Sequence, residues 1–154
     1  MLRGFATINY WAADLAAARK WYSDVLGIEP YFERGELDGR IIGPDDPDYS
    51  RARVGYIEFR VGDYQHELGL VDSRYAPGGP STSTGGVVLF WHVDDVGAAV
   101  ERLLSMGAKE YMPITPRGDS GFVTAAVVDP FGNVLGVMYN PHYLEVLGAT
   151  DQVS

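Results

Sequence analysis

Two stretches of the chain repeat one order of hydrophobic and polar positions. They begin at Ile8 and Leu89, and each predicts an aromatic-rich strand, an amphipathic helix, a glycine stop and a second short strand. An aspartate, Asp14 or Asp95, precedes each helix and can cap its first turn. Apolar residues recur at helical spacing behind them, at Leu15, Ala18, Trp21, Tyr22 and Val25 and at Val96, Ala99, Val100, Leu103 and Leu104. Each stretch therefore predicts a β-α-β unit.

Two further strands of alternating polarity follow each unit. They cover residues 54–62 and 65–72 in the first half and residues 121–129 and 133–140 in the second. A stretch rich in proline, glycine, serine and threonine separates the halves and predicts a linker. We therefore expect an α+β chain forming one structural domain, with a first βαβββ module at 1–73, a linker at 74–86, a second βαβββ module at 87–141 and a tail at 142–154.

The last strand contains a glycine that its pattern does not require. The turn Asp129-Pro130-Phe131-Gly132-Asn133 predicts a β-hairpin. In the strand after it, alternation places Val134, Gly136 and Met138 on one face. A glycine inside a strand packs nothing and often marks a close approach to the backbone. Gly136 is therefore a candidate site residue.

Composition narrows the class of protein and its partners. Hydrophobic residues make up 46% and charged residues 21% of the 154, as in ordinary globular proteins. The chain has neither an apolar run of about 20 residues nor a signal-peptide pattern, so we expect a cytoplasmic protein with no membrane partner. The lack of cysteine excludes disulfides and thiolate chemistry. The net charge of −9 argues against a nucleic-acid partner and permits a cationic ligand.

The repeat, the opening AADLAAARKWYSDVLGIEP, the strand HELGL and the ending DPFGNVLGV together resemble the vicinal oxygen chelate superfamily, over roughly residues 5–140. That superfamily includes glyoxalase I, extradiol dioxygenases, fosfomycin resistance enzymes and bleomycin resistance proteins. The resemblance implies two βαβββ modules that form an incompletely closed barrel around a cavity, and a homodimer. It does not settle function, since members range from metalloenzymes to metal-free drug binders.

For enzymatic members, the resemblance implies a divalent metal held by His, Gln or Glu on the first and last strands of the modules. Three of these positions fall on Thr7, Val88 and Gly136, which carry no plausible ligand. The fourth falls on Glu67 or on Gly69, because HELGL can be aligned in two ways. A lone carboxylate is a poor metal site, since a catalytic ion takes about three protein ligands. We therefore predict no metal and no other cofactor, with a divalent metal as the alternative.

The three histidines offer little to rebuild such a site. A group of His92, Glu67 and Glu58 can be drawn, but no spacing requires it. Alternation turns His92 toward the cavity, where a hydrogen-bonded wall residue is the simpler interpretation. It turns His66 away from Glu67, and His142 lies in the tail.

Alternation also predicts the side chains that line the cavity. They mix apolar and aromatic groups with a few polar ones, as small-molecule pockets do. The alternative is that Glu58 and Arg60 pair with one another on a solvated sheet face. The predicted lining is Thr7, Asn9, Trp11, Tyr56, Glu58, Arg60, Glu67, Val88, Phe90, His92, Val134, Gly136 and Met138.

Three functions are consistent with these residues. The first is a metal-free protein that binds a small aromatic or cationic molecule in the cavity, with rings such as Trp11, Tyr56 and Phe90 stacking on it. The second is a lyase or dioxygenase of the glyoxalase type, dependent on a metal or on carboxylates, with Glu67 as the catalytic residue. The third is a regulatory or interaction module with no small substrate.

Overall fold

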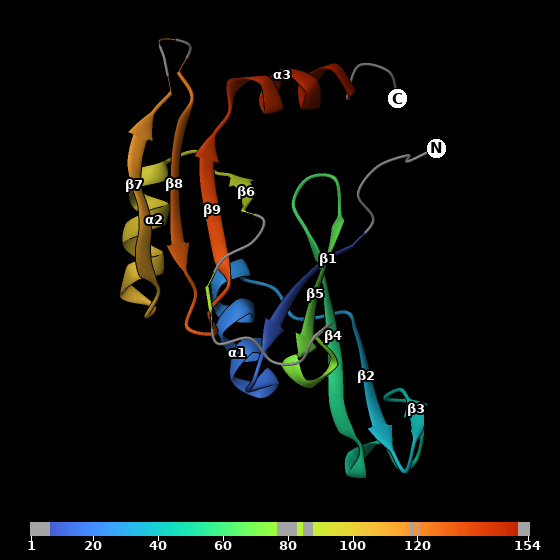
Figure 1. The fold of residues 1–154 in the computed structure, drawn as a ribbon. Coiled ribbons are helices and arrows are strands. Elements are labelled where there is room, and N and C mark those ends of the chain that lie inside the picture. The colour runs from blue at the N-terminus through green and yellow to red at the C-terminus, as the bar shows by residue number, and fades with distance from the viewer. Residues whose placement is uncertain (1–6, 77–82, 85–87, 118, 120, 151–154) are drawn as a thin grey trace. The chain divides into compact units, whose positions relative to one another are not determined.

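The computed structural model describes residues 7–76, 83–84, 88–117, 119 and 121–150. The chain forms two compact units, residues 1–82 and 83–154, and each is an α+β module with its own sheet (Figure 1). Most of the predicted linker at 74–86 lies outside the described residues. In the part of the chain that is described, no helix is long and apolar enough to cross a membrane.

The first module contains a mixed five-stranded sheet. Its elements in chain order are β1 (Thr7–Ala12), α1 (Leu15–Leu26), β2 (Phe32–Leu37), β3 (Arg40–Ile42), the 3-10 turn η1 (Tyr49–Arg51), β4 (Arg53–Val61), β5 (His66–Asp72) and the 3-10 turn η2 (Ser73–Tyr75). The sheet order is β1-β5-β4-β2-β3, and β1 runs parallel to β5 while the other pairs are antiparallel.

Helix α1 covers one face of this sheet, and its ends are those that the sequence predicts. The Asp14 carboxylate accepts a hydrogen bond from the Ala17 amide, and Gly27 ends the helix in the left-handed conformation. The buried side chains of α1 are Leu15, Ala18, Trp21 and Tyr22. They pack with the strand residues that point the same way, chiefly Tyr10, Ile57, Phe59, Val61, Leu68 and Leu70. The opposite face of the sheet is left free of this helix.

The second module repeats the arrangement with four strands. Its elements are β6 (Leu89–His92), α2 (Val96–Ser105), β7 (Lys109–Pro116), β8 (Val123–Val128), β9 (Val134–Tyr139) and α3 (Pro141–Thr150), and the sheet order is β6-β9-β8-β7. Asp95 caps α2 by accepting from the Ala98 amide. The β8–β9 hairpin forms at the predicted turn, where Asp129 accepts from the amides of Phe131 and Asn133.

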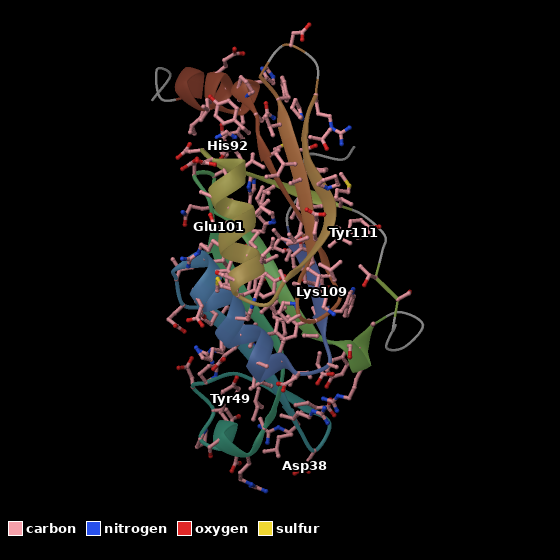
Figure 2. The ribbon with its side chains drawn as sticks, turned by 90° about the vertical axis from the view of Figure 1, so that its left-hand side faces the viewer. Asp38, Tyr49, His92, Glu101, Lys109 and Tyr111 are labelled. Carbon is pink, nitrogen blue, oxygen red and sulfur yellow. The ribbon has the colours of Figure 1, made fainter. Side chains whose placement is uncertain are left out.

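The structure differs from the sequence predictions at three places. Strand β3 was not predicted; it forms a hairpin with β2 at Asp38-Gly39, and both turn residues have positive φ (Figure 2). Leu104, one of the apolar residues at helical spacing in α2, is 39% exposed. The tail after β9 begins with the ten-residue helix α3.

Candidate functional site

The open face of the first sheet, opposite α1, brings together the polar residues that alternation placed there. β1 contributes Thr7 and Asn9, β4 contributes Tyr56, Glu58 and Arg60, and β5 contributes Glu67 and Gly69. The registers put these residues side by side, with Thr7 opposite Glu67, Arg60 opposite Glu67 and Glu58 opposite Gly69. We call this surface the first face.

Glu58 is the buried centre of the first face. Its residue is 8% exposed, and its two carboxylate oxygens accept hydrogen bonds from the hydroxyls of Tyr31 and Tyr56. Tyr31 precedes β2 and is 50% exposed, so one of the two donors reaches Glu58 from the surface. Phe32 lies opposite Glu58 on β2, and its ring is 6.2 Å from those of both Tyr31 and Tyr56. The carboxylate therefore lies beside three aromatic rings.

The Glu58 carboxylate stabilises the protonated form of both phenols. The hydrogen bond to Glu58, followed by burial, raises the pKa of Tyr31 above its usual value. Burial, together with the hydrogen bond to Glu58, raises the pKa of Tyr56 strongly. Both hydroxyls are therefore hydrogen-bond donors throughout the physiological pH range.

Glu67 belongs to a separate polar chain on the same face. Its Oε2 accepts from the Thr7 hydroxyl at 2.7 Å, and its Oε1 lies 2.7 Å from Nη2 of Arg60. The Arg60 guanidinium also lies 4.9 Å from the centroid of the Tyr31 ring. The predicted alternative in which Glu58 pairs with Arg60 on a solvated face is therefore wrong, because Arg60 pairs with Glu67 and Glu58 is buried.

The corresponding face of the second sheet is mostly apolar. On β6 it carries Phe90 and His92. Phe90 lies opposite Gly136 of β9, and His92 lies opposite Met138. Val134 and Gly136 are buried. A polar contact on this face is the hydrogen bond that Nε of Arg117 donates to the Thr124 hydroxyl at 2.9 Å.

His92 is held by the start of α3 (Figure 2). Its Nδ1 accepts a hydrogen bond from the Asn140 amide at 3.1 Å, and its ring stacks on that of Tyr143 at 4.7 Å. Its Nε2 is buried and has no hydrogen-bond partner among the described residues, with Asp94 at 3.8 Å. These contacts fit the interpretation of His92 as a wall residue.

The registers also relate the two modules to each other residue by residue. Asn9 lies opposite Gly69, and Phe90 lies opposite Gly136. Asn9 and Phe90 each precede the capping aspartate of their module by five residues. Gly69, and not Glu67, therefore corresponds to Gly136.

Gly69 has no room for a ligand side chain. A Cβ atom built there would lie 2.1 Å from Oδ1 of Asn9 and 2.8 Å from Cε2 of Tyr56. Both distances are below any real Cβ contact. The space that a metal-binding carboxylate would need is therefore filled by these two side chains.

Gly136 is blocked in the same way by Phe90. A Cβ atom there would lie 2.6 Å from Cδ1 of the ring and 3.0 Å from the Leu89 carbonyl oxygen. The close approach that a glycine inside a strand indicates is therefore made by the Phe90 ring. With Thr7 and Val88 at the two remaining positions, the residues present do not fit the metal that the resemblance implies.

The remaining acidic and histidine residues do not supply another site within a module. Among the described residues no group of three or more His, Asp or Glu side chains is placed to hold a metal. His66 is exposed beside the Tyr64 ring, and His142 is exposed and lies 3.3 Å from Glu145. Glu58 and Glu67 lie in one module and His92 in the other.

A cavity of about 390 Å³ lies elsewhere, at the turn end of the second module. Its lining includes Lys109, Glu110 and Asp129, and Figure 2 labels Lys109 at this end of β7. The Asp129 carboxylate is already bonded to the amides of its own turn. The chemistry of the first face makes that face the stronger candidate site.

Sequence reasoning missed Tyr31 and Phe32. Both precede or begin β2, a strand that was located only as the short segment after the α1 glycine stop. The signal available was the aromatic pair in the sequence EPYF, since two adjacent aromatic residues at a strand start cannot both enter the helix-side core.

Comparisons with known proteins agree with the fold. The family model described as Glyoxalase/Bleomycin resistance protein/Dioxygenase superfamily matches residues 4–137. The structure is similar to that of a glyoxalase-related enzyme from Fulvimarina pelagi, at 20% identity over 91% of this chain and 90% of that one, with a TM-score of 0.63. It is also similar to a lactoylglutathione lyase from Agrobacterium tumefaciens (20% identity, 93% and 98% covered, TM-score 0.56) and to a genomically encoded fosfomycin resistance protein from Listeria monocytogenes (11%, 91% and 95%, 0.62). A comparison with curated proteins finds no match.

Proposed function

Because the chain belongs to the Glyoxalase/Bleomycin resistance protein/Dioxygenase superfamily, we propose that it binds a small aromatic or cationic molecule and does so without the metal typical of the enzymatic members. The binding surface is the first face, where Tyr31, Phe32 and Tyr56 surround the carboxylate of Glu58. Aromatic rings with a few converging polar groups are typical of small-molecule sites.

The observation that carries this proposal is the asymmetry between the modules. On β8 the residues that correspond to Tyr56, Glu58 and Arg60 are Thr124, Ala126 and Val128, because Ala126 lies opposite Gly136 as Glu58 lies opposite Gly69. The polar groups of the repeat are thus concentrated on the first face. A duplicated fold that keeps a buried carboxylate in one copy supports a binding role for that copy.

The same proposal covers the setting in which the protein works. We propose that the protein is cytoplasmic, that it is a homodimer, as the resemblance to the superfamily implies, and that neither nucleic acid nor membrane is a partner. The acidic net charge of −9 favours cationic ligands over anionic ones.

The metal-free part is tested by metal content. Protein purified without chelator is incubated with excess nickel, manganese, iron or zinc, desalted and analysed by mass spectrometry. We expect no retained metal near one equivalent, since Gly69 and Gly136 supply no ligand. Stoichiometric retention of one metal that Glu67→Ala abolishes would contradict the proposal and favour a metalloenzyme.

A carboxylate-based lyase remains a second candidate because of Glu67. Its side chain is 25% exposed and is oriented by the Thr7 hydroxyl and Arg60, so it is accessible and fixed as a general base must be. Turnover that Glu67→Gln removes while ligand binding persists would favour this candidate.

A further inference from the structure

Glu58 is a buried carboxylate without a counter-charge. Its two oxygens accept from the hydroxyls of Tyr31 and Tyr56, which are neutral donors. No lysine, arginine or histidine forms an ion pair with it among the residues that the structure describes. By contrast, Asp72, a buried acid at the end of β5, is paired with both Arg53 and Arg74.

The arginines on the first face are directed elsewhere. Nη2 of Arg60 lies 2.7 Å from Oε1 of Glu67, and its Nη1 donates to the Gln65 carbonyl at 3.3 Å. Nη1 of Arg34, on β2, donates to the Glu33 carbonyl at 2.8 Å. Neither guanidinium therefore neutralises Glu58, although Arg60 lies on the same strand and Arg34 on the neighbouring strand β2.

A buried charge is strongly destabilising unless it is paired and hydrogen-bonded. Two phenol donors satisfy two of the lone pairs of Glu58 but leave its charge in place. A protein that needed Glu58 only for packing would do better with a neutral residue, and on β8 the corresponding residue is Ala126. The uncompensated charge therefore points to a ligand that supplies the missing cation.

The aromatic rings limit the kind of cation. Tyr31, Phe32 and Tyr56 form a row with centroids 6.2 Å apart, and guanidinium groups already lie over Phe32 at 4.0 Å and over Tyr31 at 4.9 Å. Rings attract organic cations through their faces. An inorganic divalent ion needs six or more oxygen ligands or several nitrogen donors, which this surface does not offer.

We propose that the ligand of the first face is an organic monocation, a protonated amine or a quaternary ammonium with apolar substituents, whose charge pairs with the Glu58 carboxylate. This inference rests on the proposed function and names the ligand class for the same site. Tyr31 and Tyr56 keep the carboxylate oriented while the cation approaches it, and the rings contact the substituents of the ammonium group.

The test compares two probes of equal shape, benzyltrimethylammonium and its neutral carbon analogue neopentylbenzene, by isothermal titration calorimetry with chelator present. We expect the cation to bind at least about tenfold more tightly, which is the size of one cation–π contact and one charge pair together. In Glu58→Gln this preference falls to less than about threefold. Glu36→Gln removes an exposed carboxylate of the same module, which accepts from Tyr75, and should leave the preference unchanged.

The outcomes separate the ligand class from the proposed function. Equal binding of both probes, unaffected by Glu58→Gln, would overturn the cation and keep a binding surface. Binding of neither probe up to millimolar concentration would overturn both. Glu58→Gln removes a charge that accepts hydrogen bonds from two tyrosines, so circular dichroism and urea unfolding of this variant are measured first. Tyr56→Phe keeps the carboxylate and should therefore retain the preference for the cation.

Discussion

At the scale of single residues, the site depends on two glycines and one carboxylate. Gly69 and Gly136 occupy corresponding strand positions and are both in close contact with side chains from the adjacent parallel strand. Glu58 lies opposite Gly69, so the absence of a side chain there gives Tyr56 the room to reach Glu58. The glycine at position 69 and the hydrogen bond from Tyr56 to the buried Glu58 therefore depend on each other.

The space at Gly136 can be tested by adding one methyl group. We expect Gly136→Ala to lower the free energy of unfolding by about 1–3 kcal/mol, because the Cβ would meet the Phe90 ring and the Leu89 carbonyl. Gly148→Ala, in α3, meets nothing within 4 Å and is the control, expected to be neutral or stabilising by about 1 kcal/mol. Urea unfolding measures both, and equal effects would show that the ring does not occupy this space.

The tyrosines predict a loss of stability at alkaline pH. Both have a raised pKa in the folded protein, so the folded state keeps protons that the unfolded state releases above about pH 10. Stability is therefore fully present below pH 10 and declines as the pH rises from there toward the folded values. Tyr56→Phe should make this decline less steep, measured by urea unfolding between pH 8 and 11.

A decline of the same slope in Tyr56→Phe would show that other groups cause it. Tyr64→Phe, at an exposed tyrosine on the turn before β5, is the matched control for the loss of a phenol.

At the scale of elements, the sequence predicted helices and long strands better than it predicted side chains near them. Capping aspartates and 3.6-residue spacing located α1 and α2, and alternation correctly separated Ile57 and Phe59 from Glu58. The hairpin of β3 was missed although Asp38-Gly39 is a typical two-residue turn, because the flanking strand has only three residues.

The partners of Glu58 could not be predicted from strand pattern. Tyr31 precedes β2 and reaches Glu58 across strands, and its backbone amide is bonded to the Glu58 carbonyl at 3.0 Å. Alternation states which face a residue is on, but it does not give the register between β2 and β4, which includes a shift at Arg34/Gly35. Alternation likewise does not give the register between β4 and β5, which places Arg60 opposite Glu67, its ion-pair partner.

At the scale of the whole molecule, one fold is used twice with different chemistry. Each module has a helix on one sheet face, and the other face carries a buried acid and tyrosines in the first module but mostly apolar residues in the second. Duplication preserved the positions of strands and caps, whereas the residues on the open faces diverged. We therefore propose that ligand recognition lies in the first module, within residues 7–76 of the chain.

The most direct measurement of this claim is a ¹⁵N chemical-shift map of the full chain titrated with benzyltrimethylammonium in the presence of chelator. We predict saturable shifts concentrated in β1, β2, β4 and β5, with the largest at Tyr31, Tyr56, Glu58 and Gly69. Shifts confined to the second module, or binding that appears only when a divalent metal is added, would contradict it.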